Sequence, residues 1–375
     1  MKKLTFLAVA IITLLCLSNC NNQAEQPTVA EPVSNHNEVT KIADYLYTIT
    51  YTDLDDAILE QLSNPEAAFV KQEGACSSVR NGNFHGRNLD LFYNEMCEVV
   101  VRVEKSENRF ASLAVCGAKA DVTPAVMDSL TEDLYQRLPF SVLDGINENG
   151  VVCNINVVSG EDSEPTTGTN PEGENLSLAC ANRYILDHAT SAQHAVQLLQ
   201  EHNLMGGFGS LGLHLMISDS LETYIVEFVD NQMVYYQGPR ESNSNIMTNL
   251  FSTKLPELNP HALGVERYAI LQANYEEGNT LEGMVNLMQR VKYTQAYQRC
   301  TEPFWYSEFN GGAFTVDTPN ADKEEAIEKN IEDFERHERT GLFWQTVNTS
   351  VYDIENRSLR LYVQENYDAP YDFKL

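Results

Sequence analysis

The stretch GACSSVRNGNFHGRNLD, Gly74 to Asp90, sets the architecture expected of the whole chain. It places Cys76 among small residues, and Arg87 and Asp90 follow after a glycine-marked turn. Asn-Gly between two strand-like runs is a strong hairpin signal, so we predict strands on either side of Asn81-Gly82. In such a hairpin the second strand returns beside the first. We therefore expect the side chains of Arg87 and Asp90 to reach the neighbourhood of Cys76.

Cys76 has three readings: core filling, half of a disulfide, or a nucleophile. A lone cysteine is usually buried filler, and its reactivity depends on its environment. A guanidinium near the sulfur favours the thiolate, and an aspartate can hold an amine. Arg87 and Asp90 therefore favour the nucleophile reading. The alternative is an Arg–Asp surface pair, which would stabilise the fold little.

The composition is that of a globular protein. The chain has 375 residues, of which 43% are hydrophobic and 21% are charged. This length suffices for one large domain or two ordinary ones with a sizeable core. The formal net charge of -29 argues against a nucleic-acid partner, because phosphate binding needs clustered Lys and Arg.

The N-terminus reads as an export signal. MKKLTFLAVAIITLLCLSNC, residues 1–20, has a basic start and then an apolar run too short to span a bilayer stably. Its end, LSNC, resembles a bacterial lipobox with Cys20 as the lipidated residue, and an ordinary signal peptide cut nearby is the alternative. Polar residues follow at once, as a tether would. We expect an exported lipoprotein, periplasmic or attached to the outer membrane, with residues 21–75 as linker and propeptide.

Six cysteines follow the signal, and none is part of a CxxC pair. They are Cys76, Cys97, Cys116, Cys153, Cys180 and Cys300. This spacing argues against a zinc site, and we expect no metal and no cofactor. If Cys76 is catalytic, an odd number is left, so at least one other thiol stays free.

The segment from Cys76 to Asp90 resembles the start of the mature chain in the choloylglycine hydrolase family. These are linear amide C–N hydrolases of the N-terminal nucleophile superfamily. They include bile salt hydrolases, penicillin V acylases and, more distantly, acid ceramidases. Four more segments match the family in order: DGINENGVVCNIN, IMTNLF, GVERYAIL and SVYDIENRSLRLYVQENYDAPYDFKL. Each motif is weak alone, but the ordered set of five is specific and extends from Cys76 to Leu375.

The resemblance implies a fold and a self-processing step. The fold is of the α+β class, a four-layer αββα sandwich in which two antiparallel sheets lie between helix layers, over residues 76–375. The resemblance also implies autocatalytic cleavage between Ala75 and Cys76, which frees the α-amine of Cys76. An α-amine has a pKa of about 7.7–8.0, which suits a general base.

The same resemblance implies the catalytic groups. Cys76 is the nucleophile, Arg87 favours its thiolate, Asp90 orients the new amine and Arg267 supports the site electrostatically. The oxyanion donors fall on two asparagines. One is Asn249. The other is Asn156, with Asn154 as the alternative because it has the same strand parity.

We expect a cysteine amidohydrolase that cleaves a linear amide of an acylated amine. The substrate class is a bile-salt conjugate, an N-acyl amine or a penicillin V type amide. An acyltransferase and a catalytically silent binding lipoprotein on the same scaffold are the alternatives. His214 as a base for Cys76 competes with the simpler reading of a satisfied core histidine. Homo-oligomerisation and retention of the propeptide are left open.

Overall fold

The structure is a computed structural model that describes residues 39–63, 74–91, 96–117, 122–158, 164–207, 211–252, 264–292 and 345–375. All of them belong to one compact unit, Pro32–Leu375. The predicted signal sequence and Cys20 lie outside the described residues, as does Cys300. Within the described ranges, no helix is long and apolar enough to cross a membrane.

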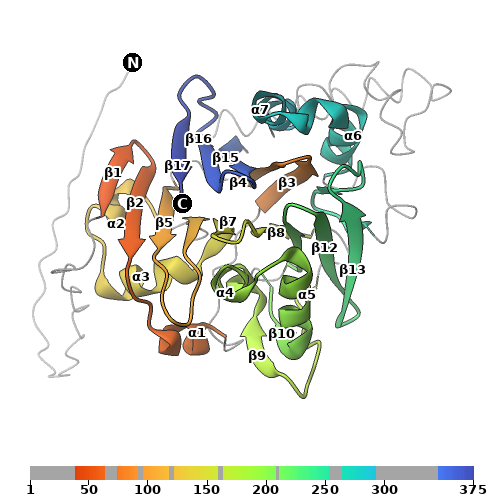
Figure 1. Ribbon diagram of the computed structural model, residues 1–375. Coiled ribbons are helices and arrows are strands. Elements are labelled where there is room, and N and C mark those ends of the chain that lie inside the picture. The colour runs from red at the N-terminus through yellow and green to blue at the C-terminus, as the bar shows by residue number, and fades with distance from the viewer. Residues whose placement is uncertain are drawn as a thin grey trace, which may run out of the picture. The chain divides into compact units, whose positions relative to one another are not determined.

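Two large sheets form the centre of the described part of the chain (Figure 1). One has nine strands, in the order β1 (Thr40–Ala43), β2 (Leu46–Tyr51), β5 (Glu98–Val103), β6 (Ser112–Cys116), β7 (Val142–Asn147), β8 (Val152–Val157), β11 (Leu213–Ser218), β12 (Glu222–Val229) and β13 (Gln232–Pro239). The other has six, in the order β14 (Ile246–Met247), β3 (Gly74–Asn81), β4 (Phe84–Leu91), β15 (Gln345–Asp353), β16 (Ser358–Val363) and β17 (Tyr371–Lys374). Neighbouring strands in both sheets are antiparallel except β2 and β5, which run parallel.

Helices cover the outer face of each sheet. The described helices are α1 (Asp56–Leu62), α2 (Pro124–Met127), α3 (Glu132–Arg137), α4 (Ala181–His188), α5 (Ala192–Glu201), α6 (Val265–Ala273) and α7 (Leu281–Arg290). In addition, β9 (Glu174–Ser177) and β10 (His202–Met205) form a small parallel sheet beside α4 and α5. Helices α4 and α5 share one apolar core with the nine-stranded sheet, and α6 and α7 share another with the six-stranded sheet.

A third apolar core lies between the sheets. It joins Val100 and Ile146 of the nine-stranded sheet to Tyr352 and Leu361 of the six-stranded sheet. The order of layers is therefore helices, sheet, sheet, helices. This confirms the predicted αββα sandwich.

Two glycines of the motif segments allow the helices to approach the sheets closely. A Cβ on Gly86 would lie 2.7 Å from Met288 Cγ of α7. A Cβ on Gly145 would lie 2.6 Å from Leu186 Cδ1 of α4. Only glycine leaves room for these contacts, so these two residues help to set the spacing of the outer layers.

The predicted hairpin forms, with its turn one residue further on. Asn81 is the last residue of β3 and pairs with Phe84, so the two-residue loop is Gly82-Asn83. Gly82 has φ +59°, at the first loop position where a type II′ turn requires glycine. The prediction that Asn81-Gly82 forms the turn was therefore wrong by one residue.

The segment after Thr123 forms two separate helices, α2 and α3, and each has its own N-cap. The hydroxyl of Thr123 accepts from Val126 N, and that of Thr131 accepts from Leu134 N. A second capping threonine begins a new helix instead of extending the first.

The part of the predicted propeptide that the structure describes is built into the large sheet. Strand β2 pairs in parallel with β5 from Leu46 to Tyr51. Tyr47, Ile49 and Leu62 are buried in the same core as α4 and α5. Helix α1 follows these strands, and neither β1 nor β2 was predicted from the sequence.

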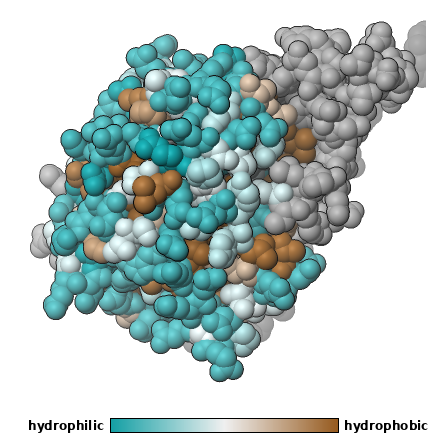
Figure 2. All heavy atoms as spheres, turned by 45° about the vertical axis from the view of Figure 1, so that its right-hand side comes forward, coloured by the Kyte–Doolittle hydropathy of each residue, from teal (hydrophilic) through white to brown (hydrophobic). Residues whose placement is uncertain are grey.

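One face of the molecular surface is shown in Figure 2. This face is mostly hydrophilic, and its hydrophobic residues form small, separate patches. Among the described residues, the exposed large hydrophobic side chains are Ile42, Leu221, Tyr235 and Tyr236.

Candidate active site

Cys76 lies on β3 between the two sheets and is 2% exposed. Its apolar neighbours are Leu89, Leu91, Met96, Leu143 and Val347. It is a free thiol, like the other four described cysteines, so the disulfide reading is wrong for Cys76 in this structure. Burial raises the pKa of the Cys76 thiol, while the Arg87 and Arg267 guanidiniums act against that rise.

Arg87 places its guanidinium against the sulfur. Its Nη2 donates to Cys76 Sγ at 3.5 Å and to the Ile155 carbonyl at 3.2 Å. Its Nη1 donates to Asp144 Oδ2 at 2.8 Å. All of these groups are buried, so the positive charge acts on the thiol with little screening by solvent.

Asp90 and Arg267 meet on the other side of Cys76. Asp90 lies directly opposite Ala75 in the β3–β4 pair, and its Oδ1 accepts from Thr346 Oγ1 at 2.6 Å. Arg267 Nη1 donates to Asp90 Oδ2 at 3.1 Å and to the Cys76 carbonyl at 2.6 Å. Burial raises the pKa of Asp90 to about 7, although Arg267 and Thr346 lower it.

Asn249 holds the backbone nitrogen of Cys76. Its Oδ1 accepts from Cys76 N–H at 3.0 Å and from Arg267 Nη2 at 2.5 Å. Its Nδ2 donates to the Val157 carbonyl at 2.8 Å. In this structure the carboxamide oxygen, rather than the N–H predicted as an oxyanion donor, therefore faces Cys76.

The other predicted oxyanion donor, Asn156, lies near Cys76 but bonds other residues. Asn156 Nδ2 donates to Ser78 Oγ at 3.2 Å and to the Met247 carbonyl at 3.3 Å. The alternative, Asn154, donates to the same Ser78 oxygen at 2.8 Å and bonds His85 through its own oxygen. Neither carboxamide contacts Cys76 in the described structure.

Val157, the residue after Asn156, supplies a group that sequence reasoning missed. Its backbone amide donates to the Cys76 thiol and lowers the pKa of that thiol. Any residue type can supply a backbone N–H, so no side-chain pattern reveals it. The position of strand β8 beside β3 brings this backbone donor to the Cys76 thiol.

His214 is a core histidine in this structure. Its Nε2–H donates to the Thr248 carbonyl at 2.8 Å, and its ring packs edge-on against Phe251. Burial lowers the pKa of His214 to about 4. Its Nδ1 is buried and has no hydrogen-bond partner in the described structure. His214 therefore lies in the core and does not bond Cys76, but only one of its two ring nitrogens is satisfied.

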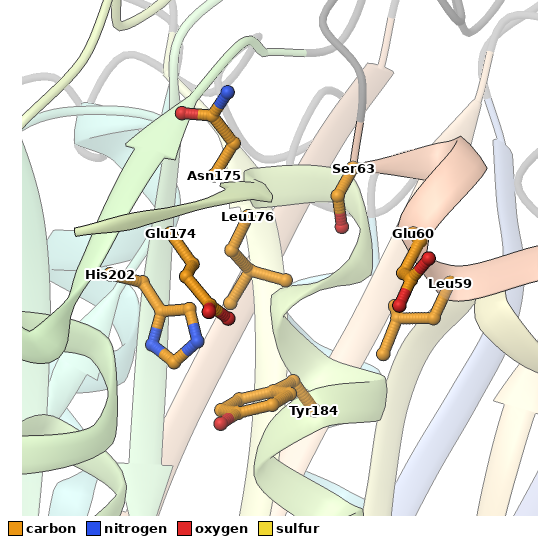
Figure 3. Close-up of a pocket in the computed structure, with 8 residues that line it drawn as sticks. All are labelled: Leu59, Glu60, Ser63, Glu174, Asn175, Leu176, Tyr184 and His202. Carbon is orange, nitrogen blue, oxygen red and sulfur yellow. The ribbon is translucent and has the colours of Figure 1, made fainter. Parts of the chain in front are cut away.

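A separate pocket of about 600 Å³ lies between α1 and the region of β9 and α4 (Figure 3). It is lined by Leu59, Glu60, Ser63, Glu174, Asn175, Leu176, Tyr184 and His202. None of these residues belongs to the cluster around Cys76. Among the described residues, no group of three or more His, Cys, Asp or Glu side chains could hold a metal ion.

Comparisons with known proteins point to one family. Residues 79–302, more than half of the chain, match the family model of acyl-coenzyme A:6-aminopenicillanic acid acyl-transferase. A penicillin V acylase from Pectobacterium atrosepticum is 30% identical over 117 residues, which are 29% of this chain and 30% of that protein. The chain thus matches about a third of the length of this curated relative.

Two solved structures resemble this chain over a greater length but at lower sequence identity. A penicillin V acylase from Agrobacterium tumefaciens is 16% identical, with 82% of this chain and 80% of that chain covered and a TM-score of 0.37. A conjugated bile acid hydrolase from Clostridium perfringens is 15% identical, with 80% and 92% covered and a TM-score of 0.42.

Proposed function

Because the chain belongs to the acyl-coenzyme A:6-aminopenicillanic acid acyl-transferase family of N-terminal nucleophile enzymes, we propose that it is an exported cysteine amidohydrolase. It cleaves a linear amide bond of an acylated amine through an acyl-enzyme on Cys76. The protein itself first cleaves the chain between Ala75 and Cys76.

One observation carries this proposal: both reactive ends of Cys76 are held by polar groups. The thiol receives hydrogen bonds from Arg87 and from the Val157 amide. The backbone nitrogen, which becomes the α-amine after cleavage, donates to Asn249. A cysteine that only fills the core needs neither set of partners.

The self-cleavage step uses the same thiol. Cys76 Sγ attacks the carbonyl carbon of Ala75, the Ala75–Cys76 C–N bond breaks, and a thioester forms. The nitrogen takes the proton that the thiol loses and becomes a free amine. Water then hydrolyses the thioester and releases Ala75 as a carboxylate. Asp90, opposite Ala75, lies close to this bond.

In turnover the free α-amine of Cys76 acts as the base. It takes the thiol proton as sulfur attacks the substrate carbonyl, and it returns that proton to the departing amine. Water then attacks the thioester and yields the acid. Hydrogen-bond donors stabilise the oxyanion. The predicted donors are Asn249 and Asn156, and the Val157 amide, which bonds the thiol in the structure, is proposed as a third.

We propose a small acyl amide as the substrate: a bile-salt conjugate, an N-acyl amine or a penicillin V type amide. The names of the relatives, penicillin V acylase and conjugated bile acid hydrolase, support this class. An acyltransferase is the second candidate, because the matched family model is named for acyl transfer. A catalytically silent binding protein is the third reading.

The upstream segment remains with the enzyme in this proposal. Residues Thr40–Leu62 supply two strands and one helix to the nine-stranded sheet and its core, so a cut before Cys76 leaves these contacts in place. With a lipid on Cys20, the bound segment would keep the enzyme at the membrane surface of the periplasm or outer membrane.

The test combines protein chemistry with a substrate panel. We expect mass and N-terminal analysis of the purified protein to find a chain that begins at Cys76. A panel of penicillin V, conjugated bile salts and N-acyl amines would then identify the hydrolysed class. Added free amines would collect the acyl group if transfer dominates. Persistent full-length chain after prolonged incubation, with no turnover, would favour the silent binding protein.

A further inference from the structure

Asp144 lies at the centre of a buried hydrogen-bonded chain that ends on the nucleophile. It is on β7 and has no exposed surface. Its Oδ2 accepts from Arg87 Nη1 at 2.8 Å, and its Oδ1 accepts from the Tyr352 hydroxyl at 2.5 Å. Asp144 belongs to the nine-stranded sheet, while both partners belong to the six-stranded sheet. The carboxylate therefore bridges the two sheets.

The Arg87 guanidinium donates from one amino group to this carboxylate and from the other to the Cys76 thiol. Nη1 is on Asp144, and Nη2 is on Cys76 Sγ at 3.5 Å. A planar guanidinium held at one edge can turn little about its long axis. The position of Nη2 at the sulfur therefore depends on the bond at Nη1, together with the bond that Nη2 itself donates to the Ile155 carbonyl at 3.2 Å.

A purely structural role explains this arrangement poorly. Removing a carboxylate and a guanidinium from water costs several kcal/mol per ion, and apolar residues of the same volume are often as stable. Apolar residues of both sheets also pack in this layer, so an apolar contact between the sheets is compatible with the fold. A charged pair between the sheets is thus better explained by what Arg87 does at Cys76.

We propose that Asp144, itself held by Tyr352, is a positioning residue that fixes the Arg87 guanidinium against the Cys76 sulfur. This rests on the proposed function, since it concerns how the same nucleophile is activated. Asp144 acts through Arg87 and does not touch the reacting atoms.

Other charged groups face the same two residues. Asp90 and Arg267 also act on Cys76, and Glu98 also faces Arg87. Glu98 makes no hydrogen bond to Arg87 in the described structure. Burial, with Asp144 nearby, raises the pKa of Glu98 to about 8, so this carboxyl is largely neutral at pH 7. Asp144 is therefore the carboxylate that orients the guanidinium.

If Asp144 positions Arg87, and if Asp144 acts only through its negative charge, its removal should shift the pKa of the Cys76 thiol in opposite directions. Asp144 is an anion, so if it acted only by its field, its loss would favour the thiolate and lower the thiol pKa. If it positions Arg87, its loss releases the cation from the sulfur and raises the thiol pKa. The direction of the shift separates the two accounts.

The experiment measures the pH midpoint of Cys76 alkylation by iodoacetamide, followed by mass analysis of the peptide that contains Cys76. The variants are Asp144→Asn and Tyr352→Phe in the full chain. The matched control for Asp144→Asn is Asp187→Asn, which removes another buried carboxylate, one that pairs with Arg109 and Arg183. The matched control for Tyr352→Phe is Tyr362→Phe, which removes the hydroxyl of another mostly buried tyrosine.

For Asp144→Asn we expect a midpoint about one pH unit higher, which is about a tenfold slower reaction below the midpoint. Tyr352→Phe should shift it in the same direction by less, and the controls should leave it unchanged. A midpoint that falls or stays constant for Asp144→Asn would overturn the proposal. If that variant does not fold, the sign of the Tyr352→Phe shift decides.

An Arg87→Ala background tests whether the effect passes through Arg87. There, Asp144→Asn should no longer raise the midpoint, because the group that it positions is absent. An equal rise in both backgrounds would contradict the proposal. Alkylation needs no substrate, so this result is separate from the proposed function, which fails if Cys76→Ala retains turnover.

Discussion

Cys76 differs from the other described cysteines in its polar neighbours. Cys97, Cys116, Cys153 and Cys180 are also buried, and burial raises the pKa of each thiol. Only around Cys76, among the described residues, do two arginines and a backbone amide all lower the thiol pKa. The difference lies in the surroundings, because all five residues are chemically the same.

Cys76→Ala should abolish both self-cleavage and amide hydrolysis, because both steps need the sulfur. Cys76→Ser should retain slow self-cleavage at most, since a hydroxyl ionises far less readily than a thiol. Mass analysis and turnover with the identified substrate measure both effects. The matched control, Cys153→Ala, removes a buried thiol elsewhere and should keep both activities. Near wild-type turnover in Cys76→Ala would refute the nucleophile.

Asn249→Ala should lower turnover on the order of 100-fold or more, as expected for loss of a polar group at the reacting centre. It should also slow self-cleavage, because Asn249 holds the Cys76 nitrogen. Asn182→Ala removes another buried carboxamide, on α4, and serves as the control. If Asn249→Ala turns over substrate at the wild-type rate while remaining folded, Asn249 has no part in the site.

Among the elements, strand β5 contains a fully buried carboxyl group, that of Glu98. Its inward face places Glu98 between the sheets with no exposed surface. Burial raises the pKa of this carboxyl from 4.5 to about 8. The folded protein therefore holds the Glu98 proton more tightly than the unfolded chain does. This contribution to stability is complete below about pH 4.5 and is lost as the pH rises through about 8.

Glu98→Gln should remove this loss, because glutamine has no proton to release. Relative to the wild type, the variant should gain stability as the pH rises from about 5 to about 8. Denaturant unfolding at several pH values measures the difference. Glu174→Gln makes the same change on an exposed side chain and serves as the control. A constant difference between Glu98→Gln and wild type across this range would contradict the assignment.

For the molecule as a whole, the segment before the proposed cleavage site is part of the fold. Strand β2 is an inner strand of the nine-stranded sheet, between β1 and β5. The hydroxyl of Tyr51 also donates to the Tyr135 carbonyl at 2.7 Å. These contacts join residues on opposite sides of the cut, so cleavage alone should not separate them.

After cleavage at Cys76, we expect the upstream fragment to co-elute with the larger chain under native conditions. The two should separate only in denaturant, as size-exclusion chromatography with mass detection can show. Release of the fragment in native buffer would contradict a retained light chain.

Ile49→Ala tests how much the packing of the upstream segment in the core contributes to the stability of the protein. Ile49 is 1% exposed, and such a truncation typically costs about 2–5 kcal/mol. Ile42→Ala is the matched control on neighbouring β1, where the side chain is 43% exposed and the expected change is within about 0.5 kcal/mol. Equal effects of the two substitutions on the melting temperature would mean that the segment does not share the core.

Several features followed from the sequence alone. The hairpin of β3 and β4 was predicted because glycine and asparagine have strong local turn preferences. The αββα class and the set Cys76, Arg87, Asp90, Asn249 and Arg267 followed from motifs that occur in a specific order. The structure brings these five residues together. The turn and each single motif consist of consecutive residues, and the order of the motifs follows the order of the chain. Both can therefore be recognised without knowing how the chain folds.

Other features depended on contacts between residues far apart in the chain. The Val157 amide reaches the thiol through strand register, and the Asp144–Arg87 pair forms only where the two sheets face each other. The inclusion of β1 and β2 in the large sheet was likewise not predicted, because pairing with β5 is a long-range choice. In the stretch GACSSVRNGNFHGRNLD the sequence predicted Cys76 as the nucleophile and predicted the hairpin, with its turn misplaced by one residue. The tertiary structure decided which groups surround Cys76, because backbone donors and buried ion pairs depend on how the layers pack.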